Sequence, residues 1–446
     1  MLRTLALLAL TAGGLAVAAA TSKPPPGMGA PASAGWGSST EPAPMPTAPN
    51  VPHLPWLQTL VDQAPAGSTL KLPPGTYSGP VLVNKPLVID GGGKVVVDGG
   101  GKGTVFVLEA NSSTLRGLHL KNSGASHDSD DACLNVRGDY NTIESLVISD
   151  CLFGIDLKQA NENLIRGNKI SSKPLSLGLR GDGLRLWYSM NNRIEDNEVI
   201  DSRDMVVWYS NGNVFSNNLG RRSRYSIHFM FANDNEVAGN RFYDNAVGVY
   251  LMYTERVNVR NNVISHATGA TGMGLGFKES SDILLENNEI IYCGVGVGSD
   301  LSPFQPDTTI RFVNNRFAFN GIAIQLTSEL GGNEMHGNTF EGNLTDVFQA
   351  GRGEGVKNKW NGNYFDTYQG FDRDEDGVGD TPHEDFSYAD RIWMEIPNAR
   401  FFKTSPVLEL LDFLERLAPF STPNLQARDE KPLYIKPERR TDGSAS

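Results

Sequence analysis

A turn-like asparagine pattern, Asn-x-Ile/Val-x-x-Asn-x-Ile/Val/Phe, recurs along most of the chain and constrains its fold more than any other feature. The second asparagine of the pattern recurs from Asn168 to Asn363, at intervals of 21 to 29 residues. This interval is too short for a propeller blade, and the leucine spacing of a leucine-rich repeat is absent. It suits one coil of a parallel β-helix, in which longer coils carry loops. The sequence therefore predicts an all-β protein, a right-handed parallel β-helix.

The asparagines give this repeat a physical cause. Asparagine at the same corner of each coil can adopt left-handed backbone angles, and its amide can stack on the next one in a hydrogen-bonded ladder. The 48 glycines among 446 residues also favour many tight turns over long helices.

Four segments follow from the composition along the chain. Residues 1–20 combine Arg3, an apolar run and three terminal alanines, which predicts a cleaved export signal. The apolar run is shorter than the roughly 20 residues that span a bilayer. Residues 21–55 are rich in proline, alanine and glycine and are expected to form a disordered leader. Residues 56–400 should form the β-helix domain, and residues 401–446 a C-terminal helix and tail.

Two short helices are expected at the ends of the β-helix. An amphipathic segment over residues 56–63 can cap the first coil. A second apolar helix is predicted over residues 407–418, between Pro406 and Pro419. It either caps the last coil or docks a partner through residues such as Leu410 and Leu414.

Charge and cysteine content limit the classes of partner and the cross-links. The formal net charge of −12 argues against a nucleic-acid partner, because phosphate binding needs basic patches. It suits cations or a basic partner. Cys133, Cys151 and Cys293 cannot all pair internally, and we expect them to be buried small apolar residues. At most one bridge can form, and Cys133 with Cys151 is the nearer pair.

The strand before the asparagine pattern separates two sets of side chains, because successive residues of a strand point to opposite faces. One set is consistently apolar and is expected to point inward: Leu184, Leu186, Met205, Val207, Ile227, Phe229, Val249, Leu251, Leu275 and Phe277. The alternate set should then face outward: Arg185, Trp187, Val206, Trp208, His228, Met230, Tyr250, Met252, Gly276 and Lys278.

The outward set contains a candidate metal site. Met230 and Met252 fall in one column on adjacent coils, about 4.8 Å apart, with His228 beside them. Thioethers select Cu(I) and imidazole accommodates it, so His228, Met230 and Met252 are predicted to bind Cu(I). The alternative is an apolar patch covered by a loop or partner. On either interpretation, Trp187, Trp208 and Tyr250 belong to an interaction surface.

A second candidate metal site lies near the end of the coils. Asp372, Asp374, Asp376 and Asp380 are spaced as in a calcium loop, with Gly377 at the turn. His383 stands where an EF-hand needs glutamate, which argues against an EF-hand and leaves open whether Ca²⁺ stabilises this loop.

An enzyme is the competing class, because many parallel β-helices cleave or epimerise polysaccharides. Such sites need several carboxylates or basic residues that converge on one external groove. The outward set offers few of them, which favours a non-enzymatic protein. A carbohydrate-binding protein or a polysaccharide-modifying enzyme of the lyase or epimerase type remains the alternative.

Several coil sequences resemble the NosD family. The runs are GDGLRLWYS at 181–189, SRDMVVWYS at 202–210, IHFMF at 227–231, VGVYLMY at 247–253, GNYF at 362–365 with GFD at 370–372, and the tail at 405–420. The resemblance covers roughly residues 57–432. Two departures are Phe365, where the family more often has tryptophan, and the varied acidic run at 374–376.

The resemblance implies a periplasmic, non-catalytic protein that reaches the membrane through the membrane and ATPase subunits of an ABC transporter. Such a protein accepts copper from a lipoprotein chaperone. It passes the copper to nitrous-oxide reductase during assembly of the copper-sulfide centre. The methionine and histidine positions of the family match His228, Met230 and Met252.

Overall fold

The computed structural model describes residues 42–269, 271–327, 331–349, 357–387 and 424–438, with single positions at 406, 410, 413, 414 and 417. The chain divides into two compact units, residues 1–42 and 43–446. The predicted signal segment 1–20, most of the leader and most of the predicted C-terminal helix lie outside the described residues.

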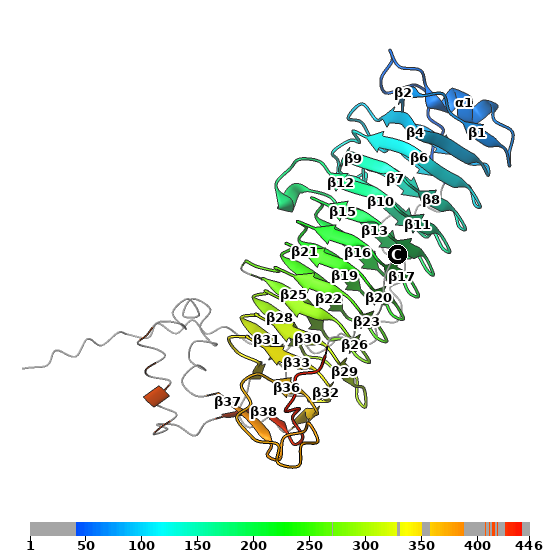
Figure 1. Cartoon of the computed structure of the whole chain (residues 1–446). Coiled ribbons are helices and arrows are strands. Elements are labelled where there is room, and N and C mark those ends of the chain that lie inside the picture. The colour runs from blue at the N-terminus through cyan, green and yellow to red at the C-terminus, as the bar shows by residue number, and fades with distance from the viewer. Residues whose placement is uncertain are drawn as a thin grey trace, which may run out of the picture. The chain divides into compact units, whose positions relative to one another are not determined.

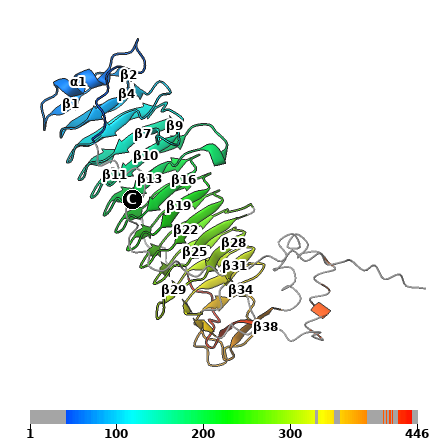
Figure 2. The same ribbon diagram turned by 180° about the vertical axis from the view of Figure 1, so that it is seen from behind.

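The unit from Ala43 onward is the predicted right-handed parallel β-helix, with about 12 turns. Figures 1 and 2 show the strands of successive coils stacked in register along the solenoid. One 12-stranded sheet carries the candidate site. Its strands are β3 (Val81–Val83), β5 (Phe106–Leu108), β7 (Ala132–Val136), β10 (Phe153–Lys158), β13 (Leu184–Trp187), β16 (Asp204–Trp208), β19 (Tyr225–Met230), β22 (Val247–Met252), β25 (Met273–Lys278), β28 (Val295–Asp300), β31 (Ile322–Leu326) and β34 (Val347–Gln349).

The remaining strands form a 26-stranded sheet whose members also stack coil upon coil. It begins with β1 (Thr69–Lys71), β2 (Gly75–Ser78), β4 (Val88–Asp98) and β6 (Thr114–Lys121). One column then runs through β8 (Thr142–Glu144), β11 (Leu164–Arg166), β14 (Arg193–Glu195), β17 (Val214–Ser216), β20 (Glu236–Ala238), β23 (Asn258–Arg260), β26 (Leu284–Glu286), β29 (Ile310–Val313), β32 (Asn333–His336) and β35 (Lys359–Asn361). The other runs through β9 (Val147–Cys151), β12 (Lys169–Ser172), β15 (Glu198–Ile200), β18 (Leu219–Arg221), β21 (Arg241–Tyr243), β24 (Val263–Ser265), β27 (Glu289–Ile291), β30 (Arg316–Ala318), β33 (Thr339–Glu341) and β36 (Tyr364–Phe365). A short 3₁₀ turn, η1 (Leu177–Leu179), lies in the longer coil between β12 and β13.

The core fills the inside of the coils, and its composition follows the predicted alternation. All ten residues of the predicted inward set are buried and belong to one continuous hydrophobic cluster. Met205 is 1% exposed within this cluster, which confirms its assignment to the core. The 12-stranded sheet therefore has a fixed inner side, and the alternate residues lie on its outer face.

The asparagine ladder is present as predicted, and it runs along one corner of the coils. Asn218 donates its backbone N–H and its side-chain amide to Oδ1 of Asn240 on the next coil, at 2.8 and 3.0 Å. Asn240 repeats both hydrogen bonds to Asn262. Because these amides are buried, the ladder satisfies polar groups that would otherwise be costly inside the solenoid.

The backbone conformation at this corner corrects one detail of the prediction. The left-handed residue is the one before each ladder asparagine, as at Asn217 with φ 56° and Gly239 with φ 69°. The ladder asparagine itself has ordinary backbone angles and turns its amide into the stack. Short polar residues and glycine tolerate the left-handed angles, which explains why asparagine, aspartate and glycine alternate there.

The first coils are covered by the predicted cap helix, α1 (Leu57–Gln63). Leu57 and Val61 join the core, and the Gln58 side chain exchanges hydrogen bonds with the backbone of Leu82. The Asn50 amide already donates to the backbone oxygen of Gly99 at 2.8 Å. Contact with the coils therefore begins before residue 56, where the sequence pattern placed the start of the domain.

The last coils are closed by two strands, β37 (His383–Ser387) and β38 (Asn424–Asp429), which pair antiparallel. Asp429 takes the place of the next ladder asparagine. Its carboxylate accepts the backbone N–H and the side-chain amide of Asn363 at 2.9 and 2.8 Å, and the N–H of Gly362 at 3.1 Å. The ladder thus ends on a buried acceptor.

All three cysteines are buried, as expected, and two of them are bridged. Cys133 on β7 and Cys151 on β9, which belong to the two different sheets, form a disulfide, and this is the nearer of the possible pairs. Cys293 is free and buried. The Cys133–Cys151 bridge adds a covalent link between coils near the N-terminal end of the fold.

Candidate functional site

The outer face of the 12-stranded sheet carries the predicted column of aromatic and thioether side chains. Trp187 pairs in register with Trp208, Trp208 with Met230, and Met230 with Met252. All four side chains are half-buried. The two thioethers therefore stand on adjacent coils, as the alternation predicted, and we call these four residues the Trp-Met column.

The Trp-Met column ends on a lysine in both directions. Lys158 is the register partner of Trp187, and Lys278 is the register partner of Met252. The apolar stretch is thus limited to four coils and has a charged border, as expected for a surface patch that meets a partner.

His228 lies beside the methionines on the outer face but is covered, contrary to the expected open position. It is 9% exposed. The Tyr225 ring stacks on it with centroids 4.9 Å apart, and the rings of Tyr250 and Trp208 approach it edge-on at 6.0 and 6.2 Å. Three aromatic rings therefore shield the imidazole that the sequence placed in the open.

The imidazole of His228 is neutral and has unused hydrogen-bonding capacity. Neither ring nitrogen has a hydrogen-bond partner among the described residues. Burial lowers the pKa of His228 to about 4; the nearby Asp204 carboxylate opposes this shift and Arg224 adds to it. A neutral imidazole keeps a lone pair for a metal ion, and buried polar atoms without partners are costly unless something binds them.

Two arginines beside this face form ion pairs with buried or partly buried carboxylates. Arg185 binds the fully buried Asp156 at 2.8 Å and Asp130 at 2.9 Å, and it lies over the Phe153 ring. Arg224 pairs with Asp204 beside His228. These ion pairs hold the flanks of the face.

Tyr225 is a site residue that the alternation missed. Counting back from the outward His228 by strict alternation places Tyr225 inside. The register between β16 and β19 shifts between Asp204 and Val206, so that Tyr225 reaches the outer face and covers His228. The buried Ser226 next to it is the sequence signal that could have indicated this bend, because a small residue is needed where two successive side chains turn inward.

The predicted calcium residues are partly brought together. Oxygen atoms of Asp372, Asp374 and Asp376 lie within 4.8 Å of one another. Asp380 is outside this group, and its carboxylate accepts the backbone N–H of Arg373 at 2.9 Å. His383, at the position of the EF-hand glutamate, is buried and stacks on Phe365. Three carboxylates rather than four form the candidate cation site.

The predicted partner-binding leucines of the tail, Leu410 and Leu414, are exposed. They are two of the few described positions in the predicted helix 407–418, the rest of which lies outside the described residues. Within the part of the chain that the structure describes, no helix has the length and apolar character needed to cross a membrane.

Comparison with known families supports the sequence resemblance. Residues 171–370 match the family described as periplasmic copper-binding protein (NosD), and residues 103–219 match the right-handed β-helix region family. A probable ABC transporter binding protein NosD of Pseudomonas aeruginosa is 36% identical over 129 residues, and that of Stutzerimonas stutzeri is 33% identical over 129 residues. Residues 171–370 of this chain are therefore similar to the NosD family. That segment contains the whole Trp-Met column and His228.

The extent of these matches is limited. The aligned stretch covers 28% of this chain and 30% and 29% of the two NosD relatives. Among solved structures, the A-module of mannuronan C-5 epimerase AlgE6 from Azotobacter vinelandii aligns over 66% of this chain and 91% of its own, with 16% identity and a TM-score of 0.48. The surface adhesin PfbA of Streptococcus pneumoniae aligns with 12% identity and a TM-score of 0.42.

Proposed function

We propose that this protein is a periplasmic copper carrier that holds Cu(I) at His228, Met230 and Met252. One observation carries the proposal: two thioethers on adjacent coils stand next to a neutral imidazole whose nitrogen atoms have no partner among the described residues. Thioether and imidazole are donors that suit Cu(I). The ion is cargo, and no change in its charge is required.

The half-buried sulfur atoms support exchange rather than storage. A carrier must release its ion, and ligands on an outer face remain within reach of a second protein. His228 completes the ligand set only when the Tyr225 ring moves off the imidazole. We infer that the methionines meet the ion first and that His228 strengthens the site when Tyr225 turns away.

The partners in this proposal are an ABC transporter, a copper-chaperone lipoprotein as donor and nitrous-oxide reductase as acceptor, whose copper-sulfide centre receives the metal. The NosD relatives are named as probable ABC transporter binding proteins, which supports the first partner. Trp187, Trp208 and Tyr250 would contact the donor or acceptor beside the metal. Leu410 and Leu414 would dock the transporter, through which the exported protein reaches the membrane.

The ion pairs on the outer face support a carrier over a polysaccharide enzyme. Acid-base catalysis needs carboxylates or basic groups that face substrate. Here Arg185 and Asp156 satisfy each other, as do Arg224 and Asp204.

The test is a titration of the purified mature protein with Cu(I) against a chromophoric chelator, without oxygen. Met230→Leu combined with Met252→Leu keeps the side-chain volume and removes both sulfur atoms. Met205→Leu is the matched control, because this methionine lies in the core of the same sheet. We expect binding in the wild type and in the control, and its loss in the double variant.

Two outcomes would contradict the proposal. Copper binding by the double variant equal to the wild type would remove the methionines from the site. Absence of binding in the wild type would leave the column as a docking patch without metal.

A further inference from the structure

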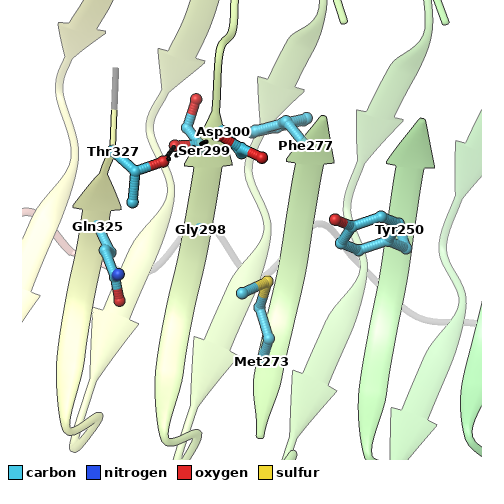
Figure 3. Close-up of a pocket in the computed structure, with 8 residues that line it drawn as sticks. All are labelled: Tyr250, Met273, Phe277, Gly298, Ser299, Asp300, Gln325 and Thr327. Carbon is cyan, nitrogen blue, oxygen red and sulfur yellow. Dashed lines mark hydrogen bonds between the residues drawn. The ribbon is translucent and has the colours of Figure 1, made fainter. Parts of the chain in front are cut away.

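A shallow hollow lies on the outer face beside the proposed copper site. It is lined by residues of the four successive strands β22, β25, β28 and β31 and by the residue after β31: Tyr250, Met273, Phe277, Gly298, Ser299, Asp300, Gln325 and Thr327 (Figure 3). Its empty volume is about 280 Å³, including the open side. Tyr250 belongs to both the hollow and the proposed copper site, because its ring also borders His228.

Two glycines create the hollow. Gly276 and Gly298 follow Tyr250 in register across the outer face. A Cβ atom on Gly276 would lie 2.7 Å from the Met273 sulfur and 2.4 Å from the Tyr250 ring, and one on Gly298 would lie 2.5 Å from the Met273 methyl group. Only bare backbone at both positions lets the Met273 side chain lie across the two strands.

Met273 is on the outer face although strict alternation would place it inside. The next residue, Gly274, faces the core, since a Cβ there would meet Ile290 and the Cys293 sulfur. Leu275 is also in the core. The chain thus turns two successive residues inward, and this turns Met273 outward, where its thioether is half-buried.

The polar groups around this thioether are available to a ligand. Figure 3 shows the Met273 methyl group pointing toward the strand of Gly298, with the Tyr250 hydroxyl on the other side of the sulfur. Asp300 is exposed, and among the described residues its carboxylate accepts one hydrogen bond, from the Thr327 hydroxyl at 3.4 Å. Its register neighbour Lys278 places its ammonium over the Tyr253 ring at 5.9 Å instead. A soft sulfur atom and an exposed carboxylate, which has no basic partner among the described residues, therefore border one open space.

We propose that this hollow is a second, weaker Cu(I) site centred on the Met273 sulfur, which takes the ion from or gives it to Met252. The inference rests on the proposed function. The thioether selects Cu(I), the Asp300 carboxylate supplies a negative charge, and the Gln325 amide oxygen and Tyr250 ring complete the surroundings. A single thioether binds weakly, as a transit site requires.

The position of Met273 relative to Met252 allows direct transfer of the ion between the two methionines. Met252 pairs with Lys278, and the Met273 sulfur lies over Gly276, two residues earlier on the same strand. The offset is about 7 Å along the strand and about 5 Å between strands. β19, β22 and β25 thus each present one outward methionine, which forms a line of soft ligands across three coils.

The experiment counts Cu(I) equivalents by chelator competition in the wild type, Met273→Leu, the Met230→Leu/Met252→Leu double variant and the triple variant, with Met205→Leu as control. We expect a tight and a weak equivalent in the wild type and in the control. Met273→Leu should lose the weak one, the double variant the tight one, and the triple variant both. Gly298→Ala, which displaces the end of the Met273 side chain but removes no sulfur atom, should weaken only the weak equivalent.

The outcomes separate this inference from the proposed function. If Met273→Leu binds as many equivalents as the wild type, the second site does not exist and the first stands. If the wild type binds a single equivalent and both Met273→Leu and the double variant abolish it, Met273 belongs to one shared site and the two-site inference is wrong. If the wild type binds no Cu(I), both proposals fail. Circular dichroism of each variant confirms that the coils are retained.

Discussion

At the residue scale, His228 decides how the outer face responds to pH. Its ring is on the outside of the sheet, yet it is enclosed by Tyr225, Tyr250 and Trp208 and has no hydrogen-bond partner among the described residues. Its pKa of about 4 lies below the ordinary value of 6.5 because burial disfavours the charged form. The pH dependence of both the free energy of unfolding and Cu(I) binding should reflect this lowered pKa.

The first prediction concerns stability against acid. Between pH 6.5 and pH 4 the unfolded chain binds a proton at residue 228 that the folded chain excludes. As the pH decreases through this window, the free energy of unfolding should therefore decrease, by up to about 3 kcal/mol through this residue. His228→Gln removes the proton uptake, so urea unfolding of this variant should depend less on pH. Parallel curves for the variant and the wild type would contradict the assignment.

The second prediction concerns copper affinity. A metal-binding imidazole must be neutral, and thioethers do not bind protons in this range. We expect the Cu(I) affinity of the tight site to stay level from about pH 7.5 to about pH 5.5. An exposed histidine with an ordinary pKa would lose affinity below about pH 6.5. Chelator competition at several pH values distinguishes the buried from the exposed histidine. A decline in Cu(I) affinity that begins at about pH 6.5 would mean that His228 is exposed in solution.

At the element scale, the asparagine ladder holds each coil to the next. Asn240 accepts two hydrogen bonds from Asn218 and donates to Asn262 and to the Phe215 carbonyl, all inside the fold. Removing this amide leaves two buried donors of Asn218 without an acceptor.

The third prediction follows from that ladder. Asn240→Ala should lower the free energy of unfolding by roughly 2 to 4 kcal/mol, because unsatisfied buried donors cost more than a lost hydrogen bond. Asn258→Ala is the matched control, since Asn258 is exposed on β23. Thermal unfolding followed by circular dichroism compares the two. Equal melting temperatures would show that the ladder contributes little.

The fourth prediction concerns the acidic loop of Asp372, Asp374 and Asp376. Three carboxylates with oxygens within 4.8 Å of one another repel unless a cation lies between them, and oxygen ligands suit Ca²⁺. Calcium should therefore raise the melting temperature by a few degrees relative to a chelator, through binding to the folded state. Asp374→Asn with Asp376→Asn should abolish this shift. An equal shift with Mg²⁺ would indicate general charge screening instead.

The elements also show what the sequence could reveal. The repeat interval predicted the solenoid, and the alternation placed Met230, Met252 and Met205 on the correct sides, because a regular strand obeys a period of two. Strict alternation did not predict the outward positions of Tyr225 and Met273, because β19 and β25 begin with a bend that turns two successive residues inward. Small residues, Ser226 and Gly274, occupy these bends. The covering of His228 depends on that bend and could not follow from alternation.

At the scale of the whole molecule, the solenoid fixes the order of the ligands because each strand is held in register by both neighbours. Met230, Met252 and Met273 occur on successive strands of one sheet. The ends must be closed separately, since an exposed last coil would offer unpaired strands. The C-terminal closure includes residues 424–429, which return to the coil of Trp360. No local pattern indicates this long-range pairing, so the sequence offered only the predicted helix over residues 407–418, as either an end cap or a docking segment.

The fifth prediction tests that closure. The Asp429 carboxylate takes up the last donors of the ladder, from Gly362 and Asn363. In Asp429→Ala these buried donors have no acceptor, so the last coil should open locally, at a cost of about 3 kcal/mol. Hydrogen exchange at the amides of Gly362, Asn363 and Tyr364 should then accelerate, while amides near Asn218 stay protected. Asp429→Asn keeps a carbonyl oxygen for Asn363 and should retain most of the protection. Unchanged exchange in Asp429→Ala would mean that β37 and β38 close the solenoid without this carboxylate.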